Sequence, residues 1–196
     1  MQQQNIKKVH VPYLLLNIFG PLVVAAAFTA LCIWARLGNV SIFISVAIDM
    51  GCILWWVLGP DQLYKNTKRK YLKELDDSGF VRNHTFNADG CTVAADVVNG
   101  KIAMIFKWNP KAYYVLPANH ITNLWVDDGK MLGGSSRVSF LFIVDGVKVR
   151  VNTFTSNKVW SMSSNYILEG ISKADLMVEN LRRAYAVANG ENVPQI

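Results

Sequence analysis

The three histidines are the residues of this 196-residue chain best suited to bind a metal ion or move a proton. His10, His84 and His120 each lack a Cys, Asp or Glu at the spacing of a metal site or a catalytic pair. An isolated histidine near the start of a strand is usually a surface or turn residue. We therefore expect no metal site and no histidine-based catalysis.

The cysteines and one glycine-rich stretch also lack a catalytic pattern. Cys32 and Cys52 lie in apolar runs, and Cys91 is in phase with apolar neighbours, so we expect Cys91 in a hydrophobic core. Three cysteines without paired spacing indicate neither a disulfide framework nor a zinc site, and are compatible with a reducing compartment. The stretch LGGSSR, residues 132–137, lacks the Lys-Ser/Thr of a phosphate loop. We therefore predict a non-enzymatic protein without a cofactor.

Apolar residues are concentrated in the first third of the chain. Residues 11–35 include no charged side chain, and residues 40–59 include only Asp49. The net charge of +6 is of the sign that nucleic-acid-binding proteins carry. Most of the excess, however, sits at residues 7–8 and 65–73, which flank the apolar runs, as expected beside an anionic bilayer. We therefore predict contact with a lipid bilayer and no direct contact with nucleic acid.

Residues 11–59 predict a transmembrane helical hairpin with a short connection at residues 36–39. Each apolar run has the roughly 20 residues that cross about 30 Å of hydrocarbon. Residues 1–10 carry two lysines, and the segment after the second run carries five Lys or Arg residues. Because basic flanks stay in the cytosol, we predict that both the N- and C-termini are cytoplasmic.

Asp49 lies near the middle of the second predicted span, where an ionised carboxylate is energetically costly. Thr29, at about the same depth in the first span, is a candidate hydrogen-bond partner within the hairpin. The alternative is that Asp49 contacts the helices of a membrane-protein partner or of another copy of this chain. Small residues four apart could bring the two helices close together; they are Ala26, Ala30, Ala47 and Gly51.

Residues 60–79 predict a basic juxtamembrane helix. Pro60 suits a first helical position, and Gly79 suits a helix terminus. Its basic residues could each contribute about 1 kcal/mol beside anionic lipid. The alternative is a solvated linker that only sets the topology. The candidate lipid-facing residues are Lys65, Lys68, Arg69 and Lys70.

Residues 80–190 predict a β-rich cytoplasmic domain. Its runs of alternating polarity are separated by Asp89-Gly90, Asn99-Gly100 and Asp145-Gly146, dipeptides that favour two-residue hairpin turns. These runs predict about seven strands in a meander.

A helix is predicted at the end of this domain, before a tail at residues 191–196. Ser172 suits its N-cap, Gly190 suits its terminus, and an apolar stripe recurs at helical spacing between them. For residues 156–171 both a short helix and an edge strand fit the pattern.

Seven antiparallel strands followed by an amphipathic helix resemble the pleckstrin-homology-like architecture. The stretches LPANHITNLWVDDGK and VDGVKVRV are similar to the bacterial form of that domain. The resemblance covers most of residues 80–188 and implies two orthogonal sheets in an open barrel, with the helix plugging one end. The expected fold class is α+β: an N-terminal two-helix transmembrane hairpin, then a β-rich barrel with a C-terminal helix.

Aromatic and charged residues around two turns are candidate partner-binding residues, because such side chains often anchor protein interfaces. Those near the first turn are Trp108, Lys111 and Tyr113. Those near the second turn are Trp125, Asp128 and Lys130.

Two spans followed by a cytosolic domain without a catalytic motif are similar to the entry-exclusion proteins of conjugative plasmids. The resemblance implies a bacterial inner-membrane protein that recognises a membrane-protein component of an incoming transfer apparatus and blocks redundant DNA transfer. Two alternatives remain open. One is a lipid-headgroup-sensing module, and the other is an accessory subunit of a membrane transport or signalling complex.

Overall fold

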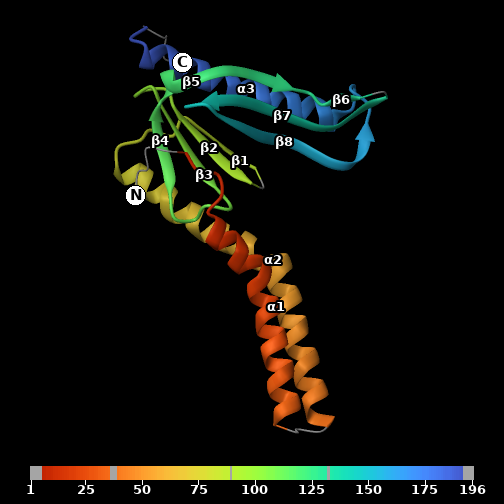
Figure 1. Ribbon diagram of the computed structural model, residues 1–196. Helices are drawn as coiled ribbons and strands as arrows, with labels where there is room; N and C mark the ends of the chain where they lie inside the picture. Colours follow the sequence, from red (N-terminus) through yellow and green to blue (C-terminus); the bar gives the residue numbers. More distant parts are fainter. Residues whose placement is uncertain (1–5, 36–38, 89, 132, 192–196) are drawn as a thin grey trace. The chain divides into compact units, whose positions relative to one another are not determined.

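The computed structural model is an α+β protein and describes residues 6–35, 39–88, 90–131 and 133–191 (Figure 1). It confirms two long apolar helices, then antiparallel sheets and a C-terminal helix. The chain forms two compact units. The helical unit comprises residues 7–70 and 107–111, and the β-rich unit comprises residues 1–6, 71–106 and 112–196. The turn residue Asp89, most of the 36–39 connection and the tail from 192 lie outside the described residues.

Helix α1, Val11–Trp34, has 24 residues and begins at the N-cap His10, whose Nδ1 accepts the Tyr13 N–H at 3.2 Å. At 1.5 Å per residue it is about 36 Å long, more than the hydrocarbon thickness of a bilayer. Only 11% of its most apolar stretch is buried. By length and composition, α1 is therefore able to cross a membrane.

Helix α2, Asn39–Asp77, also contains a stretch long and apolar enough to cross a membrane, none of it buried. The prediction of a separate helix starting at Pro60 is wrong, because α2 continues through Pro60. A proline inside a helix removes one backbone hydrogen bond, which a 39-residue helix tolerates. Gly79, with φ of +80°, follows the end of α2 as predicted.

The first sheet, here sheet A, is an antiparallel meander of β1 (His84–Asn87), β2 (Cys91–Asp96), β3 (Lys101–Phe106) and β4 (Tyr113–Pro117). Every residue of β2 is buried, so both faces of this sheet are covered. One face belongs to the main core, where Cys91 is buried as predicted. The other packs against the end of α2, where Leu75 and Phe80 contact Ala94 and Ala103.

The connection between β2 and β3 differs from the predicted two-residue turn. It has four residues, 97–100, and the carboxylate of Asp96 organises it by accepting the Asn99 N–H at 2.9 Å. Gly100 has φ of +62°, and a Cβ there would lie 2.6 Å from the backbone nitrogen of Ala188. A close approach to the C-terminal helix, rather than hairpin geometry alone, therefore requires this glycine.

The second sheet, here sheet B, is built around β7 (Gly134–Val144). It pairs with β5 (Ile121–Asp127), β6 (Lys130–Met131) and β8 (Val147–Trp160). The short helix η1, Ala118–His120, precedes β5. Asp145 and Gly146, at φ of +48° and +77°, form the predicted two-residue turn. The two-residue β6 raises the strand number in the described chain to eight.

Helix α3, Asn165–Ala188, begins eight residues before the predicted start. Its N-cap is Ser164, whose hydroxyl accepts the Ile167 N–H at 3.4 Å, and Ser172 is an exposed residue inside the helix. Residues 156–171 therefore comprise the end of β8, a turn and the start of α3. The N-cap prediction failed because Ile167 and Gly170 also face the core, which extends the apolar stripe backward.

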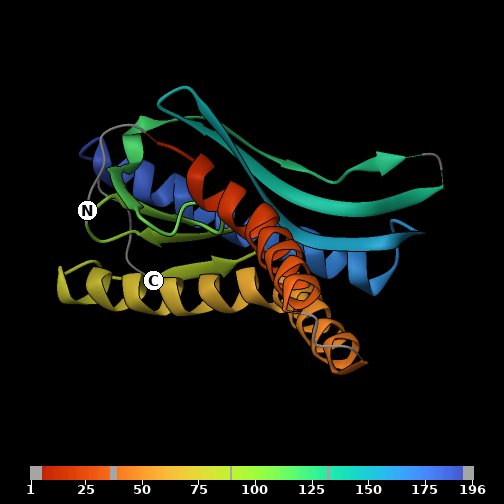
Figure 2. The same ribbon diagram turned by 60° about the horizontal axis from the view of Figure 1, so that its bottom comes forward.

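Helix α3 packs against strands of both sheets, and Figure 2 shows it running alongside them. Met177, Leu181 and Ala184 of the predicted stripe are fully buried, whereas Leu176 and Tyr185 are exposed. Among the described strands no pairing joins sheet A to sheet B, so they form no closed barrel.

Candidate functional site

The histidines occupy separate structural positions. His10 caps α1, and His120 Nδ1 lies 2.8 Å from Asp145 Oδ1 at the surface. His84 opens β1 and is half-buried. No cluster of three or more His, Cys, Asp or Glu residues suited to a metal ion occurs in the part of the chain that the structure describes.

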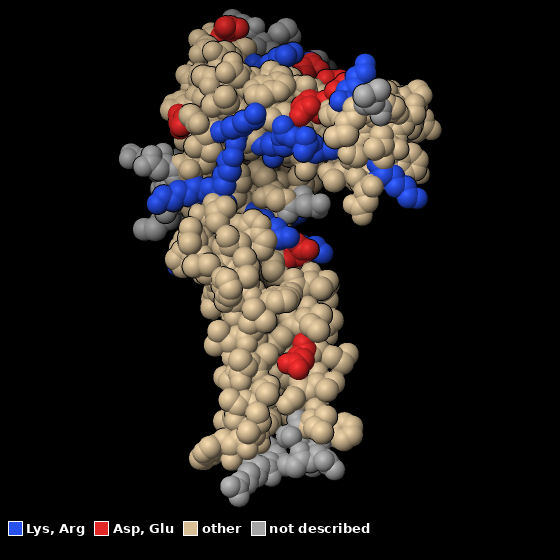
Figure 3. Space-filling model, turned by 45° about the vertical axis from the view of Figure 1, so that its right-hand side comes forward, with Lys and Arg blue, Asp and Glu red and all other residues tan. Residues whose placement is uncertain are grey.

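Asp49 and Thr29 are not brought together. The Thr29 hydroxyl donates to the backbone oxygen of Ala25 in its own helix at 3.0 Å. The Asp49 side chain is exposed, and no other described residue forms a hydrogen bond or ion pair with it. Figure 3 shows that the apolar helices present an almost uncharged surface on the face in view. The structure therefore does not show the predicted hydrogen bond between Asp49 and Thr29 within the hairpin.

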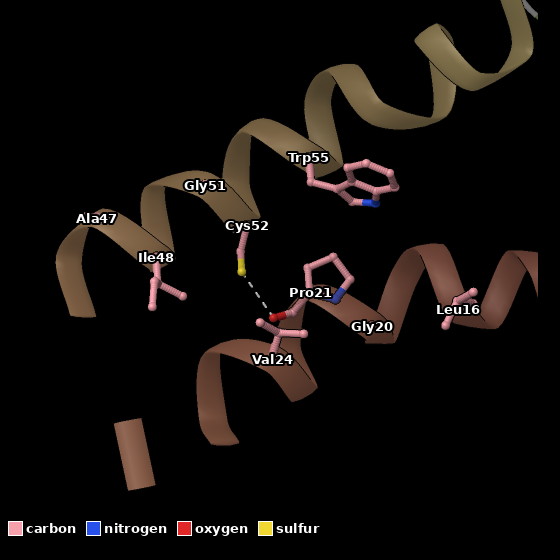
Figure 4. Close-up of a pocket in the computed structure, with 9 residues that line it drawn as sticks. All are labelled: Leu16, Gly20, Pro21, Val24, Ala47, Ile48, Gly51, Cys52 and Trp55. Carbon is pink, nitrogen blue, oxygen red and sulfur yellow. Dashed lines mark hydrogen bonds between the residues drawn. The ribbon is translucent and has the colours of Figure 1, made fainter. Parts of the chain in front are cut away.

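An apolar groove of about 590 Å³ lies between α1 and α2 (Figure 4). The Cys52 thiol donates to the Pro21 carbonyl oxygen at 3.2 Å, and the Trp56 indole donates to that of Ile18 at 3.0 Å. Ala47 and Gly51 line the groove, whereas Ala26 and Ala30 are not among its lining residues. The predicted small-residue contact is thus replaced by contacts around Pro21.

The basic residues of α2 lie in the helical unit after the apolar stretch. Lys65, Arg69 and Lys70 are exposed, and Lys68 is half-buried with its Nζ 5.7 Å from the centre of the Tyr64 ring. Their exposure leaves them accessible to a charged surface.

The first group of candidate partner-binding residues is divided between the two units. Trp108 and Lys111 belong to the helical unit, where the Trp108 carbonyl oxygen accepts the His10 N–H at 2.7 Å. Next to them, Asn109 is buried and donates to the Lys7 carbonyl oxygen at 2.7 Å, a contact that no sequence signal indicated. Trp108 is half-buried and Lys111 is exposed.

Tyr113 belongs to the β-rich unit and packs against the end of α2. Its ring centre lies 4.8 Å from that of Tyr71. Burial raises the pKa of the Tyr113 phenol, and the nearby Glu74 carboxylate adds to the rise. Tyr113 is therefore half-buried in a packing contact between α2 and sheet A.

The second group lies at one end of sheet B. Trp125 is 36% exposed, and the Nζ of Lys148 lies 5.4 Å from the centre of its ring. Asp128 lies in the following loop and Lys130 opens β6, and the Lys130 N–H donates to Asp128 Oδ1 at 3.2 Å. Ser135 holds this loop in place, because its hydroxyl lies 2.6 Å from the Asp128 carbonyl oxygen.

Trp125 shares the outer face of sheet B with a charged cluster that sequence reasoning missed. Strand register places alternate residues of β5, β7 and β8 on this face, away from the core residues Val138, Phe140 and Phe142. We call this surface the basic face; its residues are Trp125, Asp127, Arg137, Ser139, Lys148 and Arg150. The alternation in VKVRV indicated that Lys148 and Arg150 share a face, but their neighbours depend on register.

The Asp127 carboxylate is the centre of the basic face. Its Oδ2 lies 3.1 Å from the nearest guanidinium nitrogen of Arg150 and 3.9 Å from that of Arg137. Ser139, directly opposite Asp127 on β7, is fully buried, and its hydroxyl has no hydrogen-bond partner among the described residues. The Nε of Arg137 is likewise buried without such a partner. The face therefore combines excess positive charge at its surface with two buried polar atoms beneath it that lack a partner among the described residues.

No family model, no curated protein and no solved structure matches this chain. Its function is therefore argued from the arrangement described above.

Proposed function

We propose that this chain is a non-enzymatic interaction protein, anchored in the bacterial inner membrane by α1 and α2, with both termini cytoplasmic. One observation carries the proposal: two helices of membrane-crossing length leave their apolar side chains exposed and are followed by a folded β-rich unit. Large apolar surfaces on a folded protein mark a membrane or an interface. The basic residues on both sides of the hairpin support the cytoplasmic orientation.

The partner is a membrane protein or a second copy of the chain, and Asp49 contacts it inside the bilayer. An exposed carboxylate costs about 2.5–3.5 kcal/mol at the centre of a bilayer on insertion scales, unless a partner hydrogen-bonds it. Thr29 already donates to its own helix backbone, which supports a contact from outside the hairpin.

The biological role that fits this plan is entry exclusion, with a pleckstrin-homology-like β-rich unit recognising a component of an incoming conjugative apparatus. Two antiparallel sheets with a C-terminal helix packed on both support this finer fold assignment. The exposed Lys65, Arg69 and Lys70 support a contact with anionic lipid headgroups beside the anchor. Under this proposal that contact orients the protein.

Conjugation into recipient cells tests the proposal. Recipients that express the protein should receive a plasmid encoding it at a frequency about tenfold or more below empty recipients. Asp49→Leu should restore transfer, because leucine inserts readily but cannot hydrogen-bond a partner. Thr29→Val is the matched control and should still block transfer.

Membrane levels of the variants, measured by immunoblot, must be equal. Unchanged transfer across plasmid types in wild-type recipients would remove the entry-exclusion role. Equal blocking by wild type and Asp49→Leu would remove Asp49 from the partner contact.

A further inference from the structure

We propose that the basic face binds an extended acidic peptide segment of the protein partner. The inference rests on the proposed function as an interaction protein and adds the binding surface and its chemistry. It is argued from the charge, the exposed guanidinium donors and the dimensions of this face.

Charge on the basic face is unbalanced. Register places three cations, Arg137, Lys148 and Arg150, on this face of the described strands, with Asp127 as the one carboxylate among them. The side chains of Arg137 and Arg150 remain 44% and 36% exposed. A partner with negative charge is therefore complementary to this surface.

Hydrogen-bond donors are also in excess here. A guanidinium carries five N–H donors, and two guanidinium groups share a single Asp127 oxygen. The side chains of Arg137 and Arg150 are 44% and 36% exposed, so guanidinium N–H groups of both are accessible to a partner. Carboxylates are acceptors that an arginine binds through two parallel bonds, so an acidic side chain would accept from these exposed donors.

The dimensions of the face favour a peptide over a single headgroup. Arg137 and Ile143, which pairs with Lys148, are six residues apart on β7, about 20 Å at the rise of a strand. One phosphate group cannot reach both ends of such a row. An extended peptide can do so with carboxylates several residues apart, and the exposed ring of Trp125 between them can pack against its apolar part.

The test uses the full chain in nanodiscs of zwitterionic phosphatidylcholine. Fluorescein-labelled hexaglutamate is the probe, hexaglutamine is the uncharged control, and binding is measured by fluorescence anisotropy. We expect hexaglutamate to bind and to dissociate as salt is raised. Arg137→Gln/Arg150→Gln should weaken binding about tenfold or more.

Lys173→Gln/Arg183→Gln is the charge-matched control. Both residues lie on α3 in ion pairs with Glu169 and Glu179, so binding should change less than about twofold. If the arginine double variant melts at a lower temperature than wild type, Lys148→Gln serves as a second variant. We expect it to weaken hexaglutamate binding several-fold.

Equal binding of hexaglutamate by wild type and both basic-face variants would overturn the inference. So would wild-type binding no stronger to hexaglutamate than to hexaglutamine, or a preference for inorganic phosphate or phosphatidylglycerol nanodiscs over the peptide. A wild type that blocks conjugation without binding hexaglutamate would refute only this surface. Peptide binding without any block of conjugation would refute only the entry-exclusion role.

Discussion

Asp96 shows how one buried carboxylate determines local structure. It is completely buried and accepts hydrogen bonds from the Val81 N–H at 2.9 Å, the Asn99 N–H at 2.9 Å and the Asn99 side-chain amide at 2.7 Å. It therefore joins the segment after α2 to the β2–β3 turn. Asp76 and Arg82 also interact closely, through two contacts of 2.6 Å, but at the surface.

We predict that Asp96→Ala lowers the free energy of unfolding by about 2–4 kcal/mol, because it removes three hydrogen bonds made by a buried carboxylate and leaves a cavity in its place. Asp76→Ala, which removes an exposed ion pair, should cost less than about 1 kcal/mol. Thermal and chemical unfolding of the full chain in detergent measures both. Similar losses for the two variants would show that burial of Asp96 does not matter to stability.

At the scale of elements, the junction of β6, β7 and β8 depends on a glycine. Gly134 has φ of +150°, and a Cβ there would lie 1.9 Å from the Trp160 carbonyl oxygen. Gly146, in the β7–β8 turn, has φ of +77° with open space around it. A side chain would meet backbone strain at both positions, but it would overlap neighbouring atoms only at Gly134.

We predict that Gly134→Ala destabilises the protein by about 2–4 kcal/mol, because strands must shift apart to admit the methyl group. Gly146→Ala should cost about 1–2 kcal/mol, the strain of a left-handed backbone alone. Comparing the two melting temperatures isolates the contact with Trp160. A smaller loss at position 134 than at position 146 would contradict the β7–β8 packing described here.

At the scale of the whole molecule, the proposed topology makes a direct prediction. Green fluorescent protein fused after residue 196 should fluoresce, and alkaline phosphatase fused there should be inactive, because the C-terminus is cytoplasmic. Alkaline phosphatase fused after Ala35, between the two helices, should be active. Activity of the phosphatase after residue 196 would reverse the orientation, and extraction of the chain by alkaline carbonate would remove the membrane anchor.

Much of the architecture followed from local signals in the sequence. The lengths of the two apolar runs predicted α1 and the apolar part of α2, and alternation with turn dipeptides predicted the meander. Prediction failed where a local sequence signal competed with packing contacts between residues distant in the chain. Ser172 suits an N-cap, yet packing of Ile167 and Gly170 extends α3 back to Asn165.

The candidate sites show the same division. Sequence alone identified Asp49, because a carboxylate in an apolar run is visible without a fold, and it identified Trp125 as a possible anchor. Only the tertiary structure separated Asp49 from Thr29 and gathered Asp127, Arg137 and Arg150 on one face. The physical reason is that hydrophobic length and alternation are properties of neighbouring residues, whereas strand register is set by contacts between residues distant in the chain.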